Sequence, residues 1–139
     1  MSTLNQIGID QKKADALVGK LNTLLANYQV YYTNLRGFHW NLKGDKFFEL
    51  HIKFEEEYNN VAEQVDAVAE RILTLGGIAV NSFSEYLKIS DIKEVKFQPD
   101  GKAAVANILE SLKTLLVKQR ELLELSAEAN DEEIGRAHV

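Results

Sequence analysis

Apolar residues recur at helical spacing over three long stretches of the chain, at about residues 10–38, 45–75 and 102–129. This spacing is typical of helices that bury one side, because residues three and four positions apart lie on the same helical face. No alternation of apolar and polar residues, the pattern of a half-buried strand, competes with it. The chain is therefore predicted to be all-α, with long helices packed against one another.

Residue types that begin and end helices lie at the borders of these stretches. Asp10 and Asp45 stand before the first two, where a side-chain oxygen can accept from the free N–H groups of the first turn. Gly76 and Gly77 stop the second stretch. The connection over residues 77–101 is too long for a tight turn and contains the amphipathic piece SFSEYLKIS. We expect a crossover that carries a short helix.

The end of the sequence begins a further helix and does not complete it. Asn130 and Asp131 are capping residue types, and Glu132 and Glu133 suit the positive first turn of a helix. The segment EIGRAHV has almost no apolar stripe. We therefore expect a bundle whose fourth helix is truncated. Either a second chain covers the apolar face left open, or the sequence is a truncated or altered version of a longer one.

Length and composition narrow the possible chemistry. With 139 residues and no linker-like segment, the chain is predicted to form a single domain over residues 1–139. The absence of cysteine excludes disulfides, thiolate zinc sites and iron–sulfur clusters, so any metal must have nitrogen and oxygen ligands. No apolar run is long enough for a membrane span, and the start MSTLNQIGIDQKK lacks a signal-peptide core, so a cytoplasmic protein is expected. The net charge of -5 disfavours nucleic acid as a partner.

Five residues of metal-ligand type are concentrated in one region: His39, His51, Glu55, Asp66 and Glu70. His51 and Glu55 are four residues apart, as are Asp66 and Glu70, so each pair lies on one helical face. The two pairs are 15 residues apart, which separates them by ~22 Å along one helix and rotates them by about 60°. The two pairs of one chain therefore cannot bind the same metal ion. A two-fold partner with this helix antiparallel would complete two equivalent sites at a dimer interface.

His39 ends the first helical stretch, and a turn over residues 41–45 can bring it back to His51. Two imidazoles with two or three carboxylates can bind Fe(II), Zn(II) or Mn(II), and iron is favoured where open positions remain for an oxidant. Trp40 places an electron-rich ring beside this redox chemistry and is the candidate catalytic residue. Singly, these residue types are more often structural or simply exposed. The prediction rests on the whole set at these spacings.

Other site classes lack sequence support. The Glu-x-x-His motif of di-iron sites built inside one bundle is absent. The chain also has no P-loop, no Gly-x-Gly-x-x-Gly, no Gly-x-Ser-x-Gly and no HExxH motif, which leaves nucleotide-binding, hydrolase and metalloprotease interpretations without a basis.

The segments FHWNLKG, FFELH and DAVAERILTLGG resemble the Dps miniferritins, the DNA-binding proteins from starved cells. The resemblance extends over about residues 21–131. It implies a ferritin-like four-helix bundle with a short helix in the long crossover, assembled from two-fold dimers into a hollow dodecamer. It also implies a ferroxidase that oxidises Fe(II), preferably with hydrogen peroxide, and stores ferric iron, which protects against oxidative damage. Dioxygen is the other possible oxidant.

The resemblance also implies residue roles. His39 and His51 would be the histidine ligands of an inter-subunit iron site, and Asp66 and Glu70 the carboxylate ligands from the two-fold mate. This agrees with the spacing argument.

Two further positions follow from the same resemblance. Trp40 corresponds to the tryptophan that flanks the family's site. Glu55 departs from the family pattern, which usually has aspartate there. Its extra methylene moves the carboxylate, so Glu55 is either a direct ligand or a residue behind the ligands.

Two functions compete with iron oxidation and storage. The first is a structural protein that binds and compacts DNA, as some members of this family do with basic tails. Here Lys12 and Lys13 lie beside Asp10 and Asp15, and the other terminus is acidic, so DNA is not an expected partner. The second is a helical interaction module without metal, in which His39 and His51 could be replaced without loss of activity.

Overall fold

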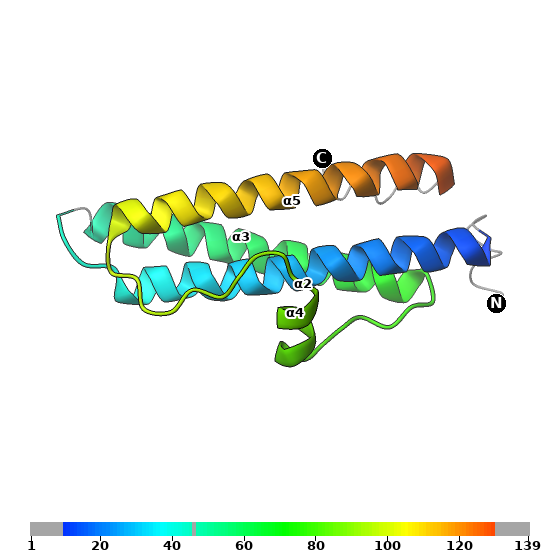
Figure 1. Cartoon of the computed structure of the whole chain (residues 1–139), viewed down its shortest axis with the longest axis horizontal. Coiled ribbons are helices and arrows are strands. Elements are labelled where there is room, and N and C mark those ends of the chain that lie inside the picture. Colours follow the sequence, from blue (N-terminus) through cyan, green and yellow to red (C-terminus); the bar gives the residue numbers. More distant parts are fainter. Residues whose placement is uncertain (1–9, 46, 130–139) are drawn as a thin grey trace.

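The structure, a computed structural model, describes residues 10–45 and 47–129, and four α-helices lie within them. The helices are α2 (Gln11–Asn41), α3 (Phe47–Thr74), α4 (Phe83–Ile89) and α5 (Gly101–Ala129). The three long helices lie along the long axis of the molecule, and the short α4 projects to one side within the crossover (Figure 1). The prediction of an all-α chain with a short crossover helix is confirmed.

Helix boundaries follow the local signals closely. The Asp10 carboxylate accepts from the backbone N–H of Lys13 at 2.9 Å and caps α2. α2 continues three residues past the predicted end at Phe38, to Asn41. Gly44 and Gly76 have positive φ angles, of 109° and 83°, in the turns that follow α2 and α3. Glycine adopts this backbone conformation without the steric cost that a side chain adds, so it suits both positions.

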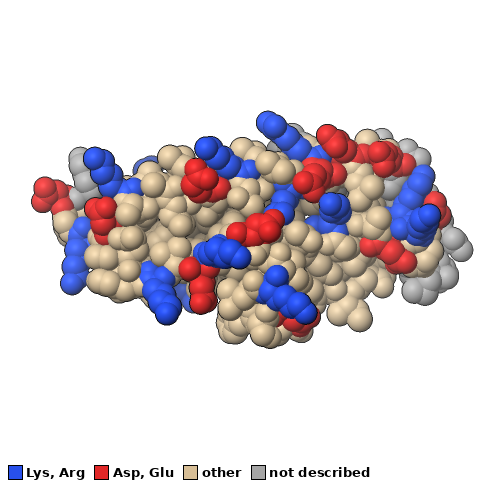
Figure 2. Space-filling model, in the orientation of Figure 1, with Lys and Arg blue, Asp and Glu red and all other residues tan. Residues whose placement is uncertain are grey.

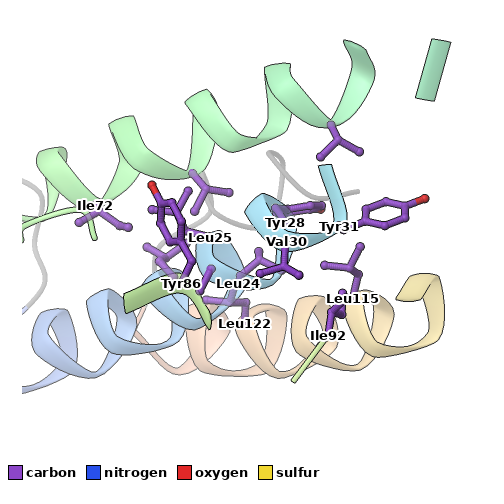
Figure 3. Close-up of a cluster of buried hydrophobic side chains, with 14 of the residues drawn as sticks. Leu24, Leu25, Tyr28, Val30, Tyr31, Ile72, Tyr86, Ile92, Leu115 and Leu122 are labelled. Carbon is purple, nitrogen blue, oxygen red and sulfur yellow. The ribbon is translucent and has the colours of Figure 1, made fainter. Parts of the chain in front are cut away.

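α2 is the central helix of the structure. It packs against α3, α5 and α4, and its buried residues point to several sides. Leu24, Leu25, Tyr28, Val30 and Tyr31 of α2 meet Ile72 of α3, Leu115 and Leu122 of α5, and Tyr86 and Ile92 of the crossover in one apolar cluster (Figure 3). By contrast, α3 buries few of its residues and exposes most of one long side. That exposed side carries the predicted carboxylate ligands.

Three asparagines of α2 fix the path of the long crossover. Asn22 donates to the Ile78 carbonyl and accepts from the Val80 N–H, both at 2.9 Å. Asn34 donates to the Lys93 carbonyl at 2.9 Å and accepts from the Val95 N–H at 2.8 Å. These amides satisfy backbone groups of a segment that has few helical hydrogen bonds of its own.

Asn27 is the central residue of this set and is fully buried. Its Oδ1 accepts from the Ser90 hydroxyl and from the backbone N–H groups of Asp91 and Ile92, at 3.0–3.1 Å. Its Nδ2 donates to the Thr23 carbonyl at 2.8 Å. One side chain therefore joins the end of α4 to the core helix.

We expect Asn27→Ala to lower the free energy of unfolding by roughly 2–4 kcal/mol, because two backbone N–H groups lose their acceptor. Asn41→Ala is a matched control, since Asn41 lies on the same helix, is exposed and only bonds back to the Gly37 carbonyl. It should change stability by less than about 0.5 kcal/mol. Urea unfolding of the three proteins checks this. Equal losses for both variants would contradict the assigned role of Asn27.

The side of α5 turned away from α2 carries exposed apolar residues, among them Leu109, Leu116 and Val117. This is the kind of open face that the predicted fourth helix, or a second chain, would cover. The predicted cap at Asn130 and Asp131 and the truncated helix after it lie outside the described residues. In the part of the chain that is described, no helix is long and apolar enough to span a membrane.

Candidate metal site

His39 and His51 lie against each other at the end of the molecule where α2 turns into α3. Their imidazole rings are stacked, with centroids 3.7 Å apart and planes inclined by 13°. The turn that contains Gly44 reverses the chain, so the last residues of α2 run beside the first turns of α3. The prediction that His39 joins His51 is confirmed.

Each histidine is anchored by the backbone of the other. His39 Nδ1 lies 2.7 Å from the His51 carbonyl oxygen, and His51 Nδ1 lies 2.9 Å from the His39 carbonyl oxygen. A carbonyl only accepts, so both Nδ1 atoms must carry hydrogen and donate. In the neutral imidazoles Nε2 then keeps its lone pair, which is the state of a metal-binding histidine oriented by a partner. The pair therefore presents two oriented nitrogen atoms of a type that can bind metal.

Two aromatic side chains enclose the pair. Phe47 stacks on His51 with centroids 4.9 Å apart, and Tyr58 meets His39 edge to face at 5.4 Å. Sequence reasoning assigned neither residue to the site. A signal was present, because Phe47 precedes His51 by one helical turn and Tyr58 follows it by two, on the same face of α3. These rings limit how far the imidazoles can turn.

The stacked arrangement constrains how metal can bind. A metal ion lies in the plane of its imidazole, about 2.1 Å from the nitrogen. Two nearly parallel rings in van der Waals contact are roughly 3.5 Å apart, so an ion in the plane of His39 is out of reach of His51. In this arrangement a metal ion bound by one histidine would be out of reach of the other.

The predicted carboxylate ligands are not gathered around the histidines of the same chain. Glu55, Asp66 and Glu70 are exposed on α3. Asp66 and Glu70 lie one turn apart, ~22 Å along the helix from His51 and Glu55. Within residues 10–45 and 47–129 of one chain, no three His, Asp or Glu side chains form a group that could hold a metal ion. The imidazoles and the carboxylates of one chain therefore lie in two separate places on the structure.

Trp40, the predicted catalytic residue, is an exposed side chain beside His39 in sequence. Its side chain is 62% exposed, and the Arg36 guanidinium lies over its ring at 4.7 Å. Adjacent helical residues project about 100° apart, so Trp40 and His39 face different directions. Among the described residues, Trp40 makes no ring contact with either histidine. A direct part for Trp40 in the site is not apparent within one chain.

A second polar contact lies deeper in the bundle. The Tyr31 hydroxyl donates to Glu57 at 2.8 Å, and burial together with this neighbouring carboxylate raises the pKa of the Tyr31 phenol. Tyr28 accepts a hydrogen bond from Gln119 at 2.5 Å, and burial raises its pKa as well. Both phenols therefore stay protonated. They belong to the interior packing of α2 with α3 and α5.

Known proteins are similar to this chain in sequence and fold. A family model described as a ferritin-like domain matches residues 18–134. An uncharacterised protein of Haemophilus influenzae is 54% identical over 126 residues, 91% of this chain and 79% of that protein. The DNA protection during starvation protein of Porphyromonas gingivalis is 43% identical over 129 residues, 93% of this chain and 81% of that protein.

Among solved structures, a Dps protein from Vibrio cholerae O1 superposes with a TM-score of 0.92 at 45% identity, over 95% of this chain and 83% of that one. It is described as a member of a broad superfamily of ferritin-like diiron-carboxylate proteins. The Dps protein of Staphylococcus aureus superposes with a TM-score of 0.85 at 34% identity, over 94% and 85% of the two chains.

Proposed function

The chain belongs to the ferritin-like family and, within it, to the Dps proteins, and on that premise we propose that it oxidises Fe(II) and stores the ferric product. Family membership supports a role in iron storage and protection against oxidative damage. The ferroxidase activity, the shared site and the oxidant described below are our proposal. Iron is the substrate and cargo in this account.

The observation that carries the proposal is the anchored histidine pair. Both Nδ1 atoms are held by backbone carbonyls, which leaves both Nε2 atoms free for metal. The carboxylates needed to complete the site lie exposed on the same helix, too far away to reach it within one chain. A two-fold partner with α3 antiparallel would bring Asp66 and Glu70 of one copy to His39 and His51 of the other. Each dimer would then hold two equivalent sites.

The proposed chemistry assigns the side chains simple roles. Imidazole nitrogens and carboxylate oxygens bind Fe(II), and the negative carboxylates favour the ferric product. Each Fe(II) gives one electron, so two Fe(II) ions reduce one hydrogen peroxide, with two protons, to two water molecules. The stacked histidines are compatible with this stoichiometry, because each ring could bind a different ion. Dioxygen is the alternative oxidant, and Zn(II) and Mn(II) are competing ions for the same ligands. Glu55 stands beside His51 as a direct or supporting carboxylate.

The test combines mass and mineral formation. Light scattering after size exclusion should give a mass near twelve chains, as proposed from the family. Anaerobic Fe(II) loading followed by peroxide should give mineral absorbance that elutes with the protein. The absence of cysteine is compatible with the reducing cytoplasm, which we propose as the compartment. A protein that leaves Fe(II) oxidation at the rate of buffer alone would contradict the proposal.

DNA binding by this chain is not expected, although a relative carries DNA protection in its name. The net charge is -5, and basic and acidic side chains are interspersed on the face shown in Figure 2. The Lys13 ammonium lies 3.4 Å from the Glu128 carbonyl oxygen. A gel-shift titration at neutral pH and physiological salt should show no retardation at micromolar protein, because few phosphate charges would be neutralised. A salt-sensitive complex under these conditions would contradict this expectation.

A further inference from the structure

One guanidinium near the histidine pair has no polar partner. Arg36 precedes His39 on α2 by about one helical turn and is partly buried. Its Nε is buried without a hydrogen-bond acceptor, and Arg36 forms no ion pair within residues 10–45 and 47–129. A buried N–H of a charged group that lacks an acceptor is costly. An acceptor from outside the described part of one chain would remove this cost.

Two aromatic rings hold this guanidinium in place. Its central carbon lies 5.2 Å from the centroid of the Tyr32 ring and 4.7 Å from that of the Trp40 ring. Tyr32 precedes Arg36 by four residues and Trp40 follows it by four, so the three side chains share one face of α2. Stacking uses the flat faces of a guanidinium and leaves the N–H groups at its edge for a carboxylate. Arg36 is therefore a positioned cation that suits a carboxylate partner.

The exposed side of α3 carries carboxylates at helical spacing. Glu63, Asp66 and Glu70 are exposed and form no ion pair within the part of the chain that the structure describes. The proposed iron site uses Asp66 and Glu70, which leaves Glu63 about one turn nearer the start of α3.

Glu63 cannot reach Arg36 of its own chain. α2 and α3 run in opposite directions away from the turn that joins them. Measured along the helices from the stacked histidines, Arg36 lies ~4.5 Å from the level of His39 and Glu63 lies ~18 Å from that of His51, both away from the turn. The two side chains of one chain are therefore separated by about 14 Å along the bundle.

A second copy changes this relation. In the proposed two-fold pair the partner's α3 is antiparallel to α3, so it runs parallel to α2. A step of three residues towards the start of α2 leads from His39 to Arg36. The same step on the partner's α3 leads from Asp66, a proposed ligand beside His39, to Glu63, and both steps cover ~4.5 Å in the same direction.

We propose that Arg36 forms an ion pair with Glu63 of the second copy, one turn from each shared site. This inference rests on the proposed function and adds the contact that fixes the register between the two copies. Arg36 is a positioning residue, because it sets where the carboxylates of the second copy lie and does not itself bind iron. The orphaned Nε and the charge complementarity of the two helices carry the inference.

The test reverses the two charges in separate chains. Arg36→Glu alone places two carboxylates together at both positions of a dimer, and Glu63→Arg alone places two cations together. The concentration at which half of the chains are dimeric should rise at least about 10-fold for each variant, because juxtaposed like charges disfavour an interface. A mixed dimer of the two variants has one cation and one carboxylate at both positions. Refolding equal amounts together should therefore give about nine mixed dimers in ten by native mass spectrometry, against about one in two for random pairing.

Two further proteins serve as controls. A chain with both Arg36→Glu and Glu63→Arg restores the pair across the interface, so it should dimerise as the unaltered protein does. Glu124→Arg makes the same charge change at an exposed residue of α5 that forms no ion pair among the described residues. Mixed with Arg36→Glu, it should give about one mixed dimer in two, because no repulsion is relieved specifically in the mixed dimer.

Random pairing of Arg36→Glu with Glu63→Arg overturns the ion pair. Fe(II) oxidation by the unaltered protein, measured on the same preparation, separates this result from a failure of the proposed function. Oxidation faster than in buffer together with random pairing leaves the proposed function standing. Preferred mixed pairing without oxidation supports the ion pair and ends the proposed function. An unaltered protein that stays monomeric overturns both the ion pair and the shared site.

Discussion

Replacing either His39 or His51 by alanine should lower the rate of Fe(II) oxidation by peroxide at least about 100-fold, since even residues that only orient a ligand contribute about 10- to 100-fold. The two single variants can be interpreted separately. Each imidazole donates to the backbone carbonyl of the other histidine, and that carbonyl remains after the alanine substitution. His51→Ala therefore removes one ligand and one stacking contact while the anchor of His39 stays in place.

The measurement is the initial rate of Fe(II) oxidation under excess peroxide, together with the number of Co(II) ions bound per chain. Each single variant should lose one bound ion per site if the stacked rings address different ions. Glu110→Ala is the control, because Glu110 is an exposed carboxylate on α5 that pairs with Lys113 at 3.4 Å. It should keep the native rate. Unchanged oxidation in both histidine variants would support the interpretation as a helical module without metal.

Most of the helical architecture could be predicted from the sequence, because local periodicity determines which side of a helix is buried. α3 and α5 were located to within about two residues by their apolar stripes and by the residues at their ends. The α2 boundary was less accurate, since Asn41 and its neighbours continue the helix after the last buried aromatic residue. The predicted turn over residues 41–45 does begin where α2 ends, so the end of the apolar stripe was the less accurate signal.

The path of the crossover could not be predicted. Asn27 contacts residues 63 to 65 positions away along the chain, and its side chain is ordinary in sequence. Only the folded arrangement shows that a buried amide on α2 is needed to satisfy backbone N–H groups after α4. Long-range hydrogen bonds of this kind leave no periodic trace in the sequence.

The candidate site also has a part that could be predicted from the sequence and a part that could not. The proximity of His39 and His51 could be predicted from the turn between the two helices. The rise per residue of a helix also predicted that Asp66 and Glu70 lie too far along the same helix to contact them. The stacking of the rings and the contacts with Phe47 and Tyr58 depend on side-chain packing and were missed. In the proposed site, a second chain supplies the carboxylates. Helical spacing predicts this arrangement, and the structure of one chain does not test it.

The shared site makes a sharp prediction for mixtures of two inactive proteins. One variant carries His39→Ala and His51→Ala, and the other carries Asp66→Ala and Glu70→Ala. Each protein alone should be inactive, because every site lacks either its imidazoles or its carboxylates. In a mixed dimer one site receives the intact histidines of one copy and the intact carboxylates of the other.

The most direct test of the shared site is therefore Fe(II) oxidation by peroxide after the two variants are unfolded and refolded together. Random pairing makes about half of the dimers mixed, and one of the two sites in each is complete, so about a quarter of the native sites should return. Mass spectrometry of the intact dimers confirms that mixed pairs have formed. Recovery near a quarter of the native activity is the predicted result. No recovery in a sample that contains mixed dimers would contradict the shared site, and Asp66 and Glu70 would then no longer be assigned to the same metal site as His39 and His51.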